Sequence, residues 1–115
     1  MTLTLPLPHR GLSPNARSHW RNRHRLTKRA RWVAKCVTLA ALAGKVSPVF
    51  TRYTLTFFFP NAIHRDDDNA AASCKAYRDG IADALGIDDH GLRLAEAPTI
   101  LIDRCKPRLE ITLMP

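Results

Sequence analysis

Alternating and helically spaced apolar residues divide the first part of the chain into a strand, a loop and a helix. Threonine and leucine alternate over residues 2–5 and proline follows, which predicts a short strand. Residues 9–25 are mostly polar and predict a loop. Apolar residues then recur at helical spacing, so we expect a helix with Thr27 at its N-cap and Gly44 just past its end.

Strict alternation makes residues 49–59 the clearest predicted strand, and Pro60 ends it. One row of side chains holds Val49, Thr51, Tyr53, Leu55, Phe57 and Phe59. The opposite row holds Phe50, Arg52, Thr54, Thr56 and Phe58. One row can pack on the helices, and we expect the two phenylalanines of the other row to be available to a partner chain.

The second half of the chain predicts another helix and two more strands. A helix is expected from about Asp68 to Leu85, with Gly86 as its C-cap. Residues 94–103 and 108–114 are expected to form the two arms of a hairpin. The resulting order, β-α-β-α-β-β, predicts an α+β fold in which two helices cover a small mixed sheet.

Length and composition are typical of one soluble globular domain spanning residues 1–115. The chain has 115 residues, of which 45% are hydrophobic and 24% are charged. No apolar run is long enough for a membrane span, and the N-terminus does not resemble a signal peptide. The three cysteines are widely spaced, which favours a reducing compartment, and we expect a cytoplasmic protein without a membrane partner.

Charge is strongly segregated along the chain. The formal net charge is +8, and all ten acidic residues follow residue 65. Residues 1–65 hold twelve of the 18 lysines and arginines. Such a distribution indicates a polyanionic partner, and nucleic acid is the one that we expect. The residues expected to contact phosphates are Arg17, Arg21, Arg23, Arg25, Lys28, Arg31 and Lys35.

Candidate chemistry lies in two acidic segments, residues 66–68 and the pair Asp88–Asp89. In an extended approach to a helix, Asp66 and Asp68 project to the same side, because side chains alternate with a period of two. Neighbouring carboxylates repel each other unless a cation neutralises them, and Mg²⁺ prefers oxygen ligands. The pair after the second helix could return to the same place.

Helical spacing places a lysine near the first acidic segment. Asp68, Ala72, Lys75 and Asp79 form one stripe of the predicted helix, and a second stripe, Ala70, Cys74, Tyr77 and Ile81, faces the core. Carboxylates that hold a metal beside an ammonium group suit phosphodiester hydrolysis. The alternative is that the aspartates only cap a helix, which one aspartate at a helix start commonly does.

A longer pattern resembles a known family. Arg65-Asp66-x-Asp68-Asn69 is followed by Lys75-x-x-x-Asp79-Gly80-Ile81 and by Ala84-Leu85-Gly86-Ile87-Asp88-Asp89. This pattern is similar to that of the RusA-type Holliday junction resolvases, which are crossover-junction endodeoxyribonucleases of phages and prophages. The founding pattern spaces the second aspartate and the lysine four residues apart, whereas seven separate them here. Both spacings return to the same helix face.

The resemblance implies a homodimer that binds four-way DNA junctions and nicks two opposed strands with Mg²⁺ or Mn²⁺. It implies that Asp66, Asp68 and Asp89 are catalytic metal ligands and that Lys75 is catalytic. Asp88 is implied as a further metal ligand or supporting acid, and Asp79 as a supporting acid. Two alternatives stay open: a non-catalytic basic DNA-binding accessory protein, and a nuclease of the same fold that acts on other branched DNA.

Overall fold

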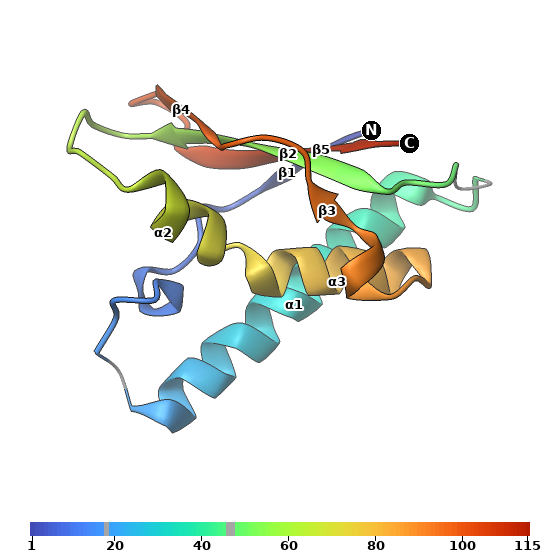
Figure 1. The fold of residues 1–115 in the computed structure, drawn as a ribbon, viewed down its shortest axis with the longest axis horizontal. Helices are drawn as coiled ribbons and strands as arrows, with labels where there is room; N and C mark the ends of the chain where they lie inside the picture. Colours follow the sequence, from blue (N-terminus) through green and yellow to red (C-terminus); the bar gives the residue numbers. More distant parts are fainter. Residues whose placement is uncertain (18, 46–47) are drawn as a thin grey trace.

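Both long helices pack on the same face of a mixed β-sheet, which confirms the predicted α+β fold (Figure 1). The computed structural model describes residues 1–17, 19–45 and 48–115. The strands are β1 (Thr2–Leu5), β2 (Arg52–Phe59), β3 (Arg93–Leu94), β4 (Thr99–Ile102) and β5 (Arg108–Met114). The helices are α1 (Trp20–Leu42), α2 (Asp67–Ala72) and α3 (Lys75–Leu85), with 3₁₀ turns η1 (Arg10–Leu12) and η2 (Asp89–Gly91).

Strand β2 is central to the sheet. It pairs antiparallel with β5, which in turn pairs antiparallel with β1. On its other side β2 pairs in parallel with β3 and, further along, with β4. The predicted terminal hairpin is therefore wrong, because its two arms lie on opposite sides of β2. The chain crosses over through α3 before β3 and β4, and such a crossover leads to parallel pairing.

The core lies between the sheet and the helix layer. Leu55 of β2 pairs with Ile111 of β5, and both are buried on the helix-covered face. Further core residues come from three strands and from both long helices: Leu3, Leu5, Ala30, Ala34, Phe57, Tyr77, Ile81 and Leu109. The opposite face carries Thr2, Thr4, Thr54, Thr56 and Thr112, which are exposed or half-buried. None of the described helices is both long and apolar enough to cross a membrane.

Helix α1 begins eight residues earlier than predicted, because its N-cap is residue 19 and not residue 27. His19 is its N-cap and accepts a hydrogen bond from the backbone N–H of Arg21 at Nδ1. The first turns of α1 extend beyond the edge of the domain (Figure 1), and most of their side chains contact water. A helix segment that buries little has no apolar period, so the sequence pattern detects the helix only from about Thr27 onward.

The second predicted helix is divided into α2 and α3. Ser73 and Cys74 separate them, and the buried Cys74 has backbone angles of φ −94° and ψ 2°. The predicted core stripe is nevertheless confirmed, because Cys74, Tyr77 and Ile81 are buried and Ala70 is half-buried. Gly86 ends α3 in the left-handed region at φ 70°, as predicted.

The second row of the central strand does not form the predicted apolar surface. β2 begins at Arg52, so the alternation does not extend back to Phe50, which is buried in the core. Phe58 is half-buried beneath the guanidinium of Arg108, whose Cζ lies 3.8 Å from the ring centroid. Neither phenylalanine is therefore freely available to a partner chain.

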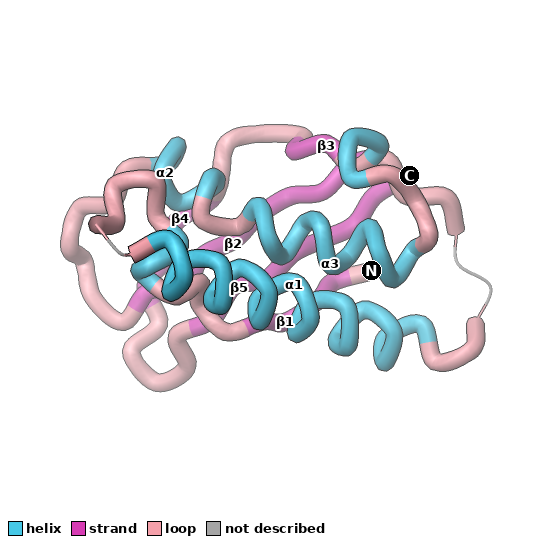
Figure 2. The backbone as a smooth tube through the Cα atoms, turned by 90° about the horizontal axis from the view of Figure 1, so that it is seen from below, coloured by secondary structure: helices cyan, strands magenta, loops and turns pink. Residues whose placement is uncertain are grey.

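Helices α1 and α3 lie side by side (Figure 2), and a glycine sets how closely they approach each other. Gly80 is buried, and a Cβ at this position would collide with the carbonyl oxygen of Arg31 and lie 3.0 Å from the Cβ of Ala34. Helix α1 can approach α3 this closely only because residue 80 has no side chain.

We expect Gly80→Ala to destabilise the protein by about 1–3 kcal/mol, because the helices must separate or strain. In an ordinary helix interior the same change is stabilising by up to about 1 kcal/mol. The sign of the change in unfolding free energy therefore shows whether the close contact exists. Urea unfolding measures the difference. Gly91→Ala is the matched control. A Cβ at Gly91 meets nothing within 4 Å, so this substitution should hardly change the free energy of unfolding. A stabilised Gly80→Ala variant would contradict the close contact.

Candidate functional site

The first acidic segment lies at the start of α2. Asp66 is the N-cap, and its Oδ1 accepts hydrogen bonds from the backbone N–H groups of Asp68 at 2.8 Å and Asn69 at 3.4 Å. Asp67 and Asp68 occupy the first turn, where negative charge is favourable, and both are exposed. Asp66 therefore has the capping role that the sequence left open, while Asp68 projects into solvent.

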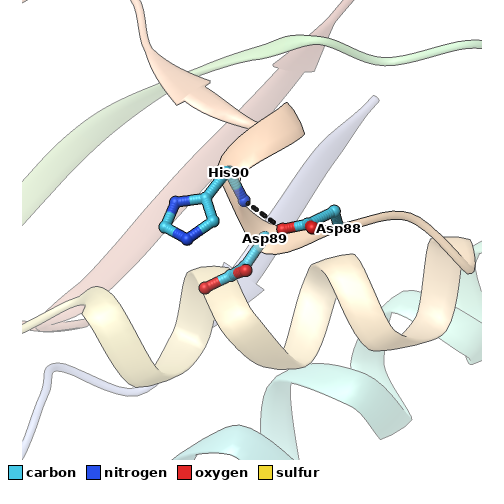
Figure 3. Close-up of side chains that lie close together, drawn as sticks. All are labelled: Asp88, Asp89 and His90. Atoms are coloured by element: carbon cyan, nitrogen blue, oxygen red, sulfur yellow. Dashed lines mark hydrogen bonds between the residues drawn. The ribbon is translucent and has the colours of Figure 1, made fainter.

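The second acidic segment forms a compact group of ligand-type side chains at η2. Asp88, Asp89 and His90 each offer a donor atom, and these atoms lie within 4.8 Å of one another (Figure 3). Asp88 caps η2 by accepting a hydrogen bond from the backbone N–H of His90 at 2.9 Å. Two carboxylates and an imidazole are chemically able to bind a divalent cation.

Arg78 of α3 connects this group to another acidic residue. Its Nη2 lies 3.2 Å from Oδ1 of Asp79 and 3.4 Å from Oδ2 of Asp89. The side chain of Arg78 is 21% exposed, and that of Asp79 is 16% exposed. The guanidinium thus supplies positive charge between two carboxylates of the predicted site. Sequence reasoning missed Arg78, because contact across eleven residues leaves no periodic signal.

The structure does not bring all the predicted metal ligands together. Among the described residues, the only group of three such side chains within 4.8 Å of one another is the one at η2. Asp66 and Asp68 stand at the start of α2, away from η2, which directly precedes β3 (Figures 1 and 2). The expected triad of Asp66, Asp68 and Asp89 is therefore divided between two places along α3.

Lys75 and Asp79 line a groove of about 300 Å³ between α3 and α1. Ala72 also lines it, so three members of the predicted stripe share one surface, whereas Asp68 does not take part. Arg23 and Thr27 of α1 form part of the opposite wall. The lysine predicted to be catalytic thus faces a groove to which the basic helix contributes.

An adjoining groove of about 330 Å³ contains Asp66. Its other polar lining residues are His9, Arg10, Ser13, Arg65, Asn69 and Ser73. Ser73 lines both grooves, so the two meet at the break between α2 and α3. Arg65 is held over the ring of Phe59 at 3.8 Å, and it donates to the Oδ1 of Asn61 at 2.8 Å.

The seven cations predicted to contact DNA differ in their surroundings. Arg17, Arg21, Arg25, Lys28 and Lys35 are exposed. Arg23 is half-buried and donates to the carbonyl oxygen of Ser13 at 3.3 Å. Arg31 instead forms a bidentate ion pair with Asp83 of α3, at 2.6 and 2.8 Å. The structure thus leaves most of this set at the surface and assigns Arg31 to the contact between helices.

Two buried titratable groups do not contribute reactive side chains. Burial raises the pKa of the Cys74 thiol to about 12. It also raises the pKa of Tyr77 to about 12, and the Tyr77 hydroxyl donates to the carbonyl oxygen of Pro6 at 2.9 Å. Both groups are neutral at ordinary pH and belong to the core, so the candidate chemistry rests on carboxylates, cations and the imidazole.

Comparison with known proteins identifies one bacterial relative. A protein of Xylella fastidiosa (strain Temecula1 / ATCC 700964), described as "Uncharacterized protein", is 50% identical over 91 residues. The matched region covers 76% of this chain and 60% of the length of that protein. No protein-family model matches the chain. No solved structure matches it either.

The Arg31–Asp83 ion pair has a testable pH dependence. Hydrogen bonding by Arg31 lowers the pKa of Asp83 below its usual 3.8. The pair therefore stabilises the fold at pH values well above 3.8, and this contribution is lost as the pH falls below 3.8 through the lowered pKa. Because the side chains are 52% and 33% exposed, we expect only about 0.5–1 kcal/mol at pH 7.

A double-mutant cycle of Arg31→Ala and Asp83→Asn, followed by urea unfolding, measures this contribution. The coupling free energy should be present at pH 7 and should decrease as Asp83 becomes protonated. Additive effects of the two substitutions at pH 7 would contradict the ion pair.

Proposed function

We propose that this chain is a metal-dependent, structure-selective endodeoxyribonuclease that nicks branched DNA, with the four-way junction as its substrate. The proposal follows the resemblance of the 65–89 pattern to RusA-type resolvases. It includes a homodimer, because a four-way junction has approximate two-fold symmetry and clean resolution requires two related cuts. The proposed DNA-binding residues are the seven predicted cations of the N-terminal half: Arg17, Arg21, Arg23, Arg25, Lys28, Arg31 and Lys35. Arg31 also forms an ion pair with Asp83.

One observation carries this proposal: acidic and basic members of the pattern line adjoining grooves. Lys75 and Asp79 share a groove with Arg23, and Asp66 lies in the next groove, beyond Ser73. A phosphodiester backbone that follows both grooves would pass cations of the N-terminal half and carboxylates of the acidic half. Cations can bind the phosphates of DNA, and nearby carboxylates can bind a metal ion. Together they suit metal-assisted hydrolysis of a phosphodiester.

The site residues have distinct roles in this proposal. Asp88 and Asp89 would hold Mg²⁺ or Mn²⁺ at η2. Asp66 and Asp68 stand apart from them at the start of α2, and their role as metal ligands rests on the resemblance. When bound, the cation supplies an activated water and neutralises charge on the phosphate. Lys75 places its ammonium group against a phosphate oxygen, where negative charge increases in the transition state. Arg78 holds Asp79 and Asp89 beside α3.

A second candidate, the non-catalytic DNA-binding protein, is favoured by the hydrogen bonds of the acids. Asp66 and Asp88 both cap helical turns, and Asp89 already pairs with Arg78. A cleavage assay separates the candidates: a synthetic four-way junction and a linear duplex of equal length, each with and without Mg²⁺. Junction-selective nicking that requires Mg²⁺ supports the nuclease, and binding without any nicking supports the alternative.

Removing single carboxylate charges tests the metal ligands. We expect Asp66→Asn, Asp68→Asn and Asp89→Asn each to abolish paired nicking of the junction, because each removes a ligand charge. Junction binding should persist or tighten, since negative charge near phosphate is lost. Glu96→Gln changes an exposed acid outside the pattern and is the matched control. Cleavage by Asp68→Asn at the wild-type rate would contradict the assignment.

Lys75 is tested by separating binding from catalysis. Lys75→Ala should slow single-turnover cleavage at saturating DNA by about 10²–10³-fold and weaken binding far less, because its charge acts mainly in the transition state. Lys106→Ala, an exposed lysine before β5, is the control and should leave the rate unchanged. If affinity falls while the saturated rate is unaffected, Lys75 only anchors a phosphate.

A further inference from the structure

Trp32 is exposed in the middle of α1, where folding does not require an aromatic side chain. Its exposed fraction is 63%, and it lies on the outward side of the helix. The inward side is marked by Ala30, Ala34 and Thr38, which are buried. A large indole ring that is mostly in water contributes little to the core, so its surroundings on the surface are informative.

The surroundings of Trp32 are cationic. Lys28 and Arg29 lie one turn before it and Lys35 lies one turn after it, and helical spacing brings these side chains next to the indole. Among the described residues, no carboxylate lies within 4.0 Å of Lys28 or Arg29, whereas Arg31 pairs with Asp83. No residue before Asp66 is acidic. The outward face of α1 is therefore a positive surface with an aromatic ring at its centre.

This combination favours nucleic acid over a membrane. A helix that lies on a membrane needs an apolar face to insert beside its basic face. The apolar face of α1 is already buried against the domain, through Ala30 and Ala34. The outward face offers cations for phosphates, one flat ring and, two turns further on, the side chain of Leu39. A ring of this kind stacks on bases of any sequence.

We infer that the outward face of α1 binds unpaired DNA, with Trp32 stacking on an exposed base while Lys28, Arg29 and Lys35 contact phosphates. The choice of DNA rests on the proposed function. The inference narrows the substrate class, because a base can stack on Trp32 only where the duplex is open. Branched DNA with unpaired nucleotides at or beside the branch is therefore a better substrate than a fully paired junction.

The test is metal-free binding, which does not depend on nicking. Labelled oligothymidylate of about 12 nucleotides and a duplex of equal length are titrated in EDTA and followed by fluorescence anisotropy. Trp32→Ala should weaken binding of the single strand by about 5- to 150-fold and leave duplex binding nearly unchanged. Leu39→Ala is the matched control, because Leu39 is 48% exposed and lies outward on the same helix.

A second measurement reports on the ring itself. Trp20→Phe leaves Trp32 as the single tryptophan of the chain, so oligothymidylate should quench the remaining fluorescence. Unchanged affinity of Trp32→Ala, an equal loss for the duplex, or quenching by polyglutamate but not by DNA would overturn the inference. If single-strand binding depends on Trp32 but Mg²⁺ produces no nicking, only the proposed nuclease function fails. If nicking occurs and Trp32→Ala binds normally, only this inference fails.

Discussion

The close packing of α1 against α3 at Gly80 determines how the charged residues of this protein are arranged. Because residue 80 has no side chain, α3 approaches the backbone of α1 at Arg31, and the Arg31–Asp83 pair spans the same contact. Lys75 and Asp79 then line the groove toward α1, while Arg78 reaches toward η2. Helix α3 thereby lies between the basic helix α1 and the acidic turn η2. It contributes Lys75 and Asp79 to the groove beside α1, and Arg78 to the ion pair at η2.

The acidic residues have protein partners in this structure, which bears on how a cation would bind. Asp66 and Asp88 accept hydrogen bonds from backbone N–H groups, and Asp89 pairs with Arg78. Capping uses one carboxylate oxygen and leaves the other for a ligand, so it does not exclude metal binding. The contact between Arg78 and Asp89 is different, because a cation bound by Asp89 has to share that carboxylate with a guanidinium.

The two faces of the sheet differ in what they offer to a partner chain. One face is buried under α1 and α3, and the other presents threonines from three neighbouring strands. Phe50, which the alternation placed on the outer row, turns into the core because it precedes the strand. A partner chain in the proposed homodimer would therefore meet a mostly polar sheet face or another surface, and not the pair of phenylalanines.

Local periodicity within the sequence determined the α+β class and the buried rows of β2 and α3, and a C-cap glycine, Gly86, determined the end of α3. These features depend on residues two to four positions apart, whose shared exposure to core or solvent is visible in the pattern. Only the tertiary structure decided that the last two strands flank β2, that α1 starts at Trp20, that Arg78 pairs with Asp89, and that the two acidic segments stay apart. Each depends on contacts between distant residues, or on helix turns that bury too little to leave a period, and spacing along the chain cannot encode such contacts.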